Sequence, residues 1–375
     1  MNVLVTGGAG FIGVHLVRRL LLEGCTVAVL DNFSPQVHGR NQELPRDLAG
    51  HVELYRADVR DAGSVSKALA SRDAVVHLAA ETGTGQSMYE VSRYQDVNLG
   101  GTAAILGAVV NKPRQGLSRI LVASSRAIYG EGRYRCQEHG IVYPRGRALD
   151  RLKAGLYEPV CPACRTECAP EATGEDCPLH PLSFYGLTKR VQEEMVFMFA
   201  EACGLSAYAL RYQNVFGPGQ SLSNPYTGIL AIFSNLARSG SAIQVFEDGK
   251  ESRDFVFVDD AVEATWRCLQ SSSGAVEALN VGTGQRTTVL EATKEILEYY
   301  HNPTPALMTG TFRQGDIRHN FADLTKITKS MCFRPRFSFR SALGRFLDWA
   351  STRPEVMHGY QTSLKEMSER GFLHG

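Results

Sequence analysis

The stretch that decides the fold is Val3-Leu-Val-Thr-Gly-Gly-Ala-Gly-Phe-Ile-Gly13. An apolar β-rich run leads into three spaced glycines, Gly7, Gly10 and Gly13, and then into a segment with apolar residues at helical spacing. In such a turn the first glycine permits the bend, the second lets the backbone approach a pyrophosphate, and the third lets the helix pack on the strand. The helix N-terminus adds unpaired N–H groups and a positive dipole end. The stretch therefore predicts a dinucleotide-binding turn.

An acidic residue completes the pattern. The next β-rich run, Thr26 to Leu30, ends in Asp31. A carboxylate at the end of the second strand accepts both hydroxyls of an adenosine ribose, and its charge repels the 2′-phosphate of NADP. The sequence thus predicts NAD as the cofactor, and the competing interpretation is a glycine-rich turn followed by a solvated aspartate.

The same alternation of strand and helix continues along the chain. We expect an α/β fold in which a doubly wound parallel (Rossmann) sheet carries a smaller C-terminal substrate lobe and a Cys-rich insertion. The expected NAD-binding domain comprises residues 1–214, with 254–282 returning to it; 215–253 and 283–375 form the lobe, and 133–181 the insertion. The expected strands are Val3 to Thr6, Thr26 to Leu30, Val52 to Arg56, Ala74 to Leu78, Arg119 to Ser124, Ala207 to Tyr212 and Ala278 to Val281.

Composition limits the function classes. The 375 residues carry 40 basic and 39 acidic side chains, a net charge of +1, which argues against a nucleic-acid or membrane-surface partner. No apolar run has the length of a membrane span, and the chain starts with a structural strand instead of a signal peptide. The nine cysteines do not resemble a disulfide framework, so we expect a cytoplasmic protein.

Two helices favour self-association. The segment beginning near Asn98 and the segment from Tyr185 to Cys203 are apolar on more than one face. Deep burial would explain this pattern, and a homodimer interface is the alternative that we predict.

Tyr185 and Lys189 form the candidate catalytic pair. Their spacing places a phenol and an ammonium on one face of a helix, where the lysine charge would favour the phenolate. The predicted strand from Arg119 runs into the hydroxyls of Ser124 and Ser125 at the carboxyl edge of the sheet, where ligands bind in open α/β sheets.

With these motifs the chain resembles the extended short-chain dehydrogenase/reductase family, and within it the NAD-dependent nucleotide-sugar epimerases and dehydratases. The matching motifs are the glycine turn, Asp58-Val, His77-Leu-Ala-Ala, Ser125 four residues before Tyr129, and Tyr185 with Lys189. The resemblance implies a catalytic triad of Ser125, Tyr185 and Lys189. It also implies tightly bound NAD, with cofactor contacts from Gly7, Gly10, Phe11, Ile12, Gly13, Asp31, Asn32, Asp58, Val59, Leu78, Ala79, Ala80, Asn98, Tyr185, Lys189 and Tyr212.

The resemblance further implies a nucleotide-diphosphate sugar as substrate. The substrate contacts that we expect from it are Thr82, Arg126, Asn214, Arg253 and Arg318, although each arginine could instead form a surface ion pair. The implied reaction oxidises a sugar hydroxyl, with Tyr185 as base and Ser125 bonded to the developing ketone.

The reaction class depends on the two residues after Ser125. A 4,6-dehydratase of the family typically has Asp and Glu at these positions, whereas this chain has Arg126 and Ala127, so a 4-epimerase is favoured. A decarboxylase remains open because Arg126 could hold a carboxylate. The insertion, with the segments Glu81 to Tyr89 and Ser124 to Tyr129, resembles the subgroup of dTDP-L-rhamnose 4-epimerases, which implies a dTDP-6-deoxyhexose as substrate. A non-catalytic NAD-binding scaffold is disfavoured by the intact triad.

The insertion has the spacing of a metal site. Cys136-x2-His139 and Cys161-x2-Cys164 form two knuckles, which predict a closed, structural zinc site with four protein ligands. Cys168 and Cys177 are competing ligands, and the alternative is a flexible loop that carries reduced thiols.

Overall fold

The computed structural model describes residues 1–39, 42–110, 116–226, 228–354 and 359–375. Residue 227 and residues 355–358, which fall within the expected substrate lobe, lie outside the described residues.

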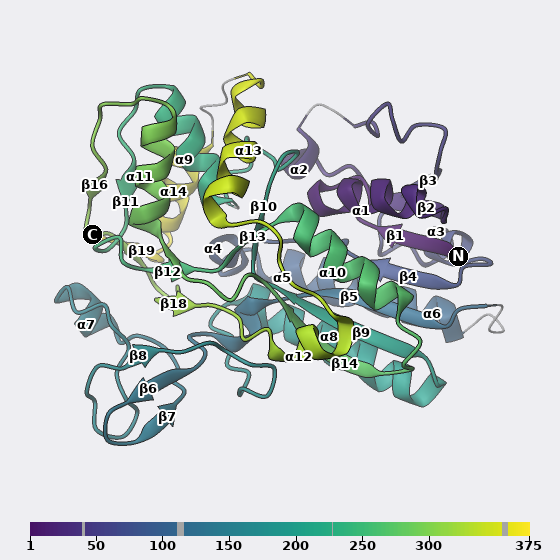
Figure 1. Ribbon diagram of the computed structural model, residues 1–375, viewed down its shortest axis with the longest axis horizontal. Helices are drawn as coiled ribbons and strands as arrows, with labels where there is room; N and C mark the ends of the chain where they lie inside the picture. The colour runs from purple at the N-terminus through teal and green to yellow at the C-terminus, as the bar shows by residue number, and fades with distance from the viewer. Residues whose placement is uncertain (40–41, 111–115, 227, 355–358) are drawn as a thin grey trace.

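A seven-stranded sheet forms the centre of the larger part of the molecule (Figure 1). Its strands lie in the order β14-β9-β5-β4-β1-β2-β3, and every neighbouring pair is parallel. All seven runs predicted from the sequence are strands of this sheet, which confirms the α/β doubly wound fold. The strands are β1 (Asn2–Thr6), β2 (Thr26–Asp31), β3 (Glu53–Arg56), β4 (Ala74–His77), β5 (Arg119–Ser125), β9 (Ser206–Tyr212) and β14 (Val276–Val281).

Helices cover both faces of this sheet, because successive strand residues point to opposite sides and both sides are apolar. In β1, Val3 and Val5 join the core cluster beneath α1 (Phe11–Leu22) and α10 (Val258–Gln270), whereas Leu4 joins the cluster beneath α3 (Ala62–Ala68) and α6 (Gly101–Val110). The long helix α8 (Phe184–Cys203) packs on β5 and β9 through Val196 and Ala200.

The lobe has a core of its own, built around Phe216, Phe255, Phe257 and Phe346. The helix α12 (Thr325–Met331) packs back on the sheet side instead, beside β14, because Ile327 and Met331 join the core cluster of β1. The helices of the lobe are α9 (Ile229–Arg238), α11 (Val289–Tyr299), α13 (Phe339–Ser351) and α14 (Tyr360–Glu369), in the left half of Figure 1. Its short strands are β10 (Asn214–Phe216), β11 (Gln244–Val245), β12 (Ser252–Arg253), β13 (Phe255–Phe257), β15 (Thr287–Thr288), β16 (Leu307–Met308), β17 (Phe312–Arg313), β18 (His319–Asn320) and β19 (Leu373–His374).

The insertion is ordered around a small three-stranded sheet, and Figure 1 shows it projecting beside β12 and β18. Its elements are β6 (Tyr134–Cys136), β7 (Gly140–Val142), α7 (Leu149–Lys153) and β8 (Ala169–Pro170). All nine cysteines are free thiols in the structure.

The outer surface of α8 keeps apolar side chains exposed. Phe184, Leu187 and Met198 are 38%, 43% and 72% exposed. A homodimer through this face stays a prediction. Within the residues that the structure covers, no helix has the length and apolar character needed to cross a membrane.

Candidate functional site

The glycine turn has no room for side chains. Gly7 adopts φ +68°, and a Cβ added to it would lie 2.7 Å from the backbone nitrogen of Ala79. A Cβ on Gly13 would lie 2.3 Å from the carbonyl oxygen of Gly7. Because β1, the turn and α1 pack backbone to backbone, the N-terminal N–H groups of α1 face the carboxyl edge of the sheet, as pyrophosphate binding requires. Phe11 and Ile12, the first residues of α1, lie at this end.

Asp31 closes the turn at the end of β2. Its carboxylate is 7% exposed and accepts hydrogen bonds from the backbone nitrogens of Ala9, at 3.0 Å, and Phe33, at 2.9 Å. The next residue, Asn32, donates to Asp58 at 3.2 Å. The structure therefore brings together the residues expected at the adenosine ribose, and the fixed carboxylate is suited to accept ribose hydroxyls.

Asp58 and Val59 lie next to the residues expected at the ribose, and their side chains have different environments. The Arg60 side chain donates two hydrogen bonds to Asp58, which lowers the pKa of that carboxyl to about 2 and keeps it ionised. Val59 is 5% exposed and packs on Gly101, so its side chain belongs to the core and only its backbone is presented to a ligand.

The end of β4 carries a neutral histidine. His77 is 2% exposed and bonds Thr6 through Nδ1, at 2.8 Å, and Thr102 through Nε2, at 3.1 Å. Burial, together with the charge of Lys189, lowers its pKa to about 3. His77 thus fixes the strand end, and the following residues 78–80 lie against the glycine turn.

Ser125, Tyr185 and Lys189 meet at the same edge. Ser125 ends β5, and Tyr185 and Lys189 lie in the first two turns of α8, whose N-cap Ser183 accepts from the nitrogen of Gly186. Burial raises the pKa of Tyr185, while a hydrogen bond with Ser125 and the charge of Arg126 lower it. The tyrosine therefore lies beside the serine, as a proton transfer to a sugar oxygen between them would require.

Lys189 is buried beside this pair. Its Nζ donates to the carbonyl oxygen of Ala123 at 2.9 Å and lies 6.0 Å from the centre of the Tyr185 ring. Burial lowers its pKa to about 7. When it is protonated, the lysine therefore holds a positive charge close to the Tyr185 ring.

Asn98 holds this region together. It is fully buried in the π-helical turn Gln95–Gly100, a feature that is frequent at functional sites. Its amide accepts from the backbone nitrogen of Glu81, at 2.8 Å, and donates to Thr188 on α8, at 2.9 Å. Asn98 therefore connects the end of β4 to the catalytic helix.

A cavity lies between the sheet edge and the lobe. Arg126, Asn214 and Arg253, three of the expected substrate residues, line it. Within the described part of the chain, the Arg126 guanidinium has no hydrogen bond or ion pair, and the Asn214 side-chain oxygen is buried without a partner. Arg253 is 7% exposed and donates to Asp316 at 3.2 Å. The cavity is thus rich in donors suited to an anionic ligand.

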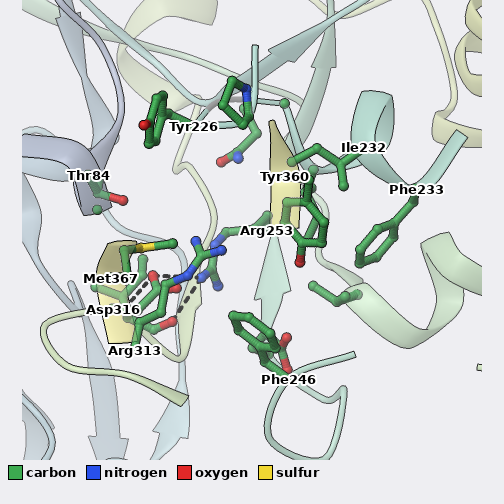
Figure 2. Close-up of a pocket in the computed structure, with 18 of the residues that line it drawn as sticks. Thr84, Tyr226, Ile232, Phe233, Phe246, Arg253, Arg313, Asp316, Tyr360 and Met367 are labelled. Atoms are coloured by element: carbon green, nitrogen blue, oxygen red, sulfur yellow. Dashed lines mark hydrogen bonds and ion pairs between the residues drawn. The ribbon is translucent and has the colours of Figure 1, made fainter. Parts of the chain in front are cut away.

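Two lining residues were not anticipated from the sequence. Arg313 and Asp316 face the cavity beside Arg253 (Figure 2), and the Arg313 guanidinium lies 5.0 Å from the centre of the Phe246 ring. Figure 2 also shows Ile232 and Phe233 along another wall, which makes that side apolar. No local pattern in the sequence distinguishes Arg313, in the Phe312-Arg-Gln-Gly-Asp segment, from Arg318 five residues later.

The structure does not place Arg318 where we expected it. This residue is fully buried outside the lining of the cavity, and its guanidinium binds Glu158, Glu247 and Asp248 at 2.8 to 3.0 Å. With its donors held by carboxylates it is a structural ion pair, and Arg313 takes the position in the cavity.

Tyr212 and Thr82 were also expected to contact ligands, and the structure gives their side chains other neighbours. The Tyr212 side chain is buried against α10, where its hydroxyl lies 2.6 Å from that of Thr265, so it does not face the cofactor edge. Thr82 is exposed next to the cavity-lining Thr84, and its carbonyl oxygen accepts from the hydroxyl of Tyr94 at 2.6 Å.

The four expected metal ligands lie together in the insertion. The donor atoms of Cys136, His139, Cys161 and Cys164 are all within 4.8 Å of one another. The Cys136 sulfur lies 3.6 Å from the Cys164 sulfur and 3.7 Å from Nδ1 of His139, which is also 3.7 Å from the Cys161 sulfur.

Neither competing cysteine belongs to this group. Cys168 is buried beside it, and its sulfur donates to the carbonyl oxygen of Thr166 at 3.5 Å. Cys177 packs in a separate cluster with Tyr129 and Tyr143.

Known proteins match nearly the whole chain. The model of the NAD dependent epimerase/dehydratase family matches residues 3–145 and 160–282, and the gap between the two matched segments, 146–159, falls within the insertion. The dTDP-L-rhamnose 4-epimerase of Burkholderia thailandensis is 38% identical over 354 residues, which cover 93% of this chain and 94% of that protein. Among solved structures, the UDP-glucose 4-epimerase of Thermotoga maritima with UDP-glucose superposes with a TM-score of 0.77 at 28% identity, over 94% of this chain and 99% of that one. The UDP-glucose 4-epimerase of Thermus thermophilus in complex with NAD gives a TM-score of 0.73 at 27% identity, over 94% and 100% of the two chains. The chain therefore belongs to the NAD dependent epimerase/dehydratase family and is an NAD-dependent enzyme of the epimerase type.

Proposed function

We propose that the protein is a nucleotide-sugar 4-epimerase that acts through a transient 4-keto sugar, with a dTDP-6-deoxyhexose such as dTDP-L-rhamnose as substrate. The observation that carries this proposal is the contact of Tyr185 with Ser125 at the edge of a cavity that presents Arg126, Arg253 and Arg313. The identity of the sugar rests on the 38% identical relative, whose name states that substrate.

The cofactor site fits a dinucleotide, because the backbones around Gly7 and Gly13 leave room for no side chain and Asp31 is fixed beside them. NAD supplies a hydride acceptor and, later in the cycle, the donor of the same hydride. We propose that the expected residues of the turn, of β2, of Asp58 and of residues 78–80 hold it, together with Tyr185 and Lys189.

The side chains of this protein then transfer the proton and bind the substrate. Tyr185 takes the proton of the sugar hydroxyl and returns it after the sugar has turned over, and Ser125 donates a hydrogen bond to the oxygen between these steps. Lys189 holds a positive charge near the phenolate when it is protonated. Arg313 binds the diphosphate through its paired N–H groups, and Asn214 donates to the same ligand. Both Nη groups of Arg253 already donate to protein oxygens, so this arginine contributes its positive charge from the cavity wall.

The residues after Ser125 separate the possible reactions. Ala127 has no group that transfers a proton, and Arg126 stays charged because its pKa, although lowered by burial, is still about 10. The acid and base of a dehydratase are thus missing at these positions. Decarboxylation is the second candidate, favoured by the unpaired guanidinium of Arg126, which could bind a sugar carboxylate.

The test is incubation of the purified protein with a panel of dTDP- and UDP-sugars without added NAD(P)H, followed by chromatography and NMR of the products. A C4 epimer without net change of cofactor would support the proposal and identify the substrate. Release of carbon dioxide from a uronate would favour the second candidate, and no conversion of any sugar would refute both in favour of a scaffold.

We also propose that Cys136, His139, Cys161 and Cys164 bind a structural zinc ion. A tetrahedral ion with Zn–S of about 2.3 Å and Zn–N of about 2.0–2.1 Å requires donor atoms about 3.6–3.8 Å apart, which matches the measured separations. A hydrogen bond with Thr166 lowers the pKa of the Cys164 thiol to about 6, which favours the thiolate that zinc binds. Metal analysis of protein purified without chelator tests this proposal, and well below one zinc per chain would refute it.

A further inference from the structure

The metal cluster shares a hairpin with residues that reach the lobe. Cys161 and Cys164 lie in a hairpin that is closed by the bridge between Val160 and Glu167 and by the hydrogen bond from the Cys168 nitrogen to Pro159. Residues 157 and 158 enter this hairpin directly before its first ligand. The metal ligands and these two residues are therefore parts of one local structure.

Glu158 connects the hairpin to the lobe. Its carboxylate accepts from Nε of Arg318 at 2.8 Å and lies 3.1 Å from Nε2 of His319. Burial opposes its ionisation, yet the bond from His319 and the charge of Arg318 lower the pKa of Glu158 to about 2. The neighbouring Tyr157 donates to the carbonyl oxygen of Gly310 at 3.3 Å. The hairpin thus carries a fixed negative charge into the base of the lobe.

Arg318 links Glu158 to a segment that lines the cavity. Its Nη1 donates to Glu247 at 2.8 Å, and Arg147, which is also in the insertion, donates to the same carboxylate at 2.8 Å. Glu247 is 6% exposed and has a φ of +50°, a conformation that a side chain such as glutamate adopts only when its surroundings hold it. Its neighbour Phe246 lines the cavity beneath the guanidinium of Arg313. Arg147 and Arg318, the second of which is oriented by Glu158, therefore hold Glu247 in place. The adjacent Phe246 lies beneath Arg313 and supports it.

We propose that the metal-binding hairpin is the outer anchor of the nucleotide cavity, with Glu158 as a positioning residue that acts on Phe246 and Arg313 through Arg318 and Glu247. The inference rests on the proposed zinc site and on the proposed role of the cavity. The contacts that carry it do not involve the glycine turn or Asp31, so loss of the anchor should weaken nucleotide binding and leave bound NAD unchanged.

The first test measures hydrogen–deuterium exchange of the segment 244–252 in the full-length protein, because this readout needs no ligand. The variant is Glu158→Gln, which keeps the size of the side chain and removes its charge. The matched control is Glu167→Gln in the same hairpin, since Glu167 is 56% exposed at its side chain and pairs with Arg151 on the insertion. We expect exchange in this segment to quicken about three- to tenfold in E158Q and to stay unchanged in E167Q. Equal exchange in E158Q and the wild type would overturn the inference.

The second test distinguishes the effect of the bound metal from the effect of the Glu158 charge. Metal content, bound NAD and the Kd for dTDP are measured for the wild type, for the two variants and for chelator-treated wild type. We expect chelation to reproduce the E158Q effect, with a Kd about three- to tenfold higher and unchanged NAD. If exchange quickens in E158Q but not after removal of bound metal, the role of the metal is refuted. Should E158Q fold poorly, Tyr157→Phe is a milder variant, because it loses only the hydrogen bond to Gly310.

Discussion

Replacement of Tyr185 by phenylalanine should remove turnover and leave the fold intact. The change deletes one oxygen atom, and the ring keeps its edge-on contact with Tyr94, at 6.4 Å between ring centres, and its place in the capped first turn of α8. The lost hydrogen bond with Ser125 is worth about 1 kcal/mol of stability. The lost acid–base group is worth about 10²- to 10⁴-fold in rate, which is about 3–5 kcal/mol at 1.36 kcal/mol per decade.

The assay follows the sugar by NMR or chromatography and measures bound NAD and the melting temperature of the same samples. Tyr208→Phe is the matched control, because it deletes a buried phenolic hydroxyl that bonds Ser271 at 2.9 Å, away from the triad. We expect both variants to retain NAD and to melt within a few degrees of the wild type, and only Y185F to lose turnover. A Y185F protein that converts the sugar within threefold of the wild-type rate would refute the role of the phenol.

Three further changes test other parts of the structure. Cys161→Ser should lower the zinc content below one per chain and the melting temperature by about 5 °C or more, whereas Cys332→Ser, at an exposed thiol, should change neither. Glu251→Gln should stabilise the protein by about 1–3 kcal/mol at pH 8 and have little effect at pH 4, as thermal melts would show. Burial raises the pKa of that carboxyl from 4.5 to about 7, so the native state binds its proton more tightly and stability falls as pH rises from 4.5 to 7. Arg126→Met should raise the melting temperature, because it removes a guanidinium without a partner from the cavity wall, and should raise the KM for the nucleotide sugar about tenfold; a lower melting temperature with unchanged KM would contradict this reasoning.

The central sheet could be predicted because each of its strands is a local pattern. A run such as Val27 to Leu30 is apolar throughout, as a parallel strand with both faces covered must be. The strands of the lobe could not be found in this way. Pairs such as Ser252–Arg253 and Phe312–Arg313 have only two residues, and tertiary pairing decides their conformation.

In the candidate site, too, the features set by local sequence could be predicted and those set by tertiary contacts could not. The glycine turn and Asp31 could be located from the sequence because turn, strand end and helix start are neighbours in the chain. Arg313 was overlooked in favour of Arg318 because the two lie five residues apart in one segment, and no local pattern says which one faces the cavity. The carboxylates that bind Arg318, Glu158 and Glu247, come from remote parts of the chain.

The unpaired donors in the cavity argue most directly for an anionic ligand. Arg126 has no partner within the residues that are described, and Nε of Arg313 is buried without one. Each such group costs stability when it is removed from water without a hydrogen bond. Arg318 shows how this chain treats a buried arginine that has only a structural role, since carboxylates surround it. Arg126 and Arg313 lack this compensation, which a diphosphate would supply on binding, whereas Arg253 is already paired with Asp316. The contrast predicts that a nucleotide diphosphate stabilises the protein more than the corresponding nucleoside does, and equal shifts of the melting temperature at saturation would remove the electrostatic basis of the proposed site.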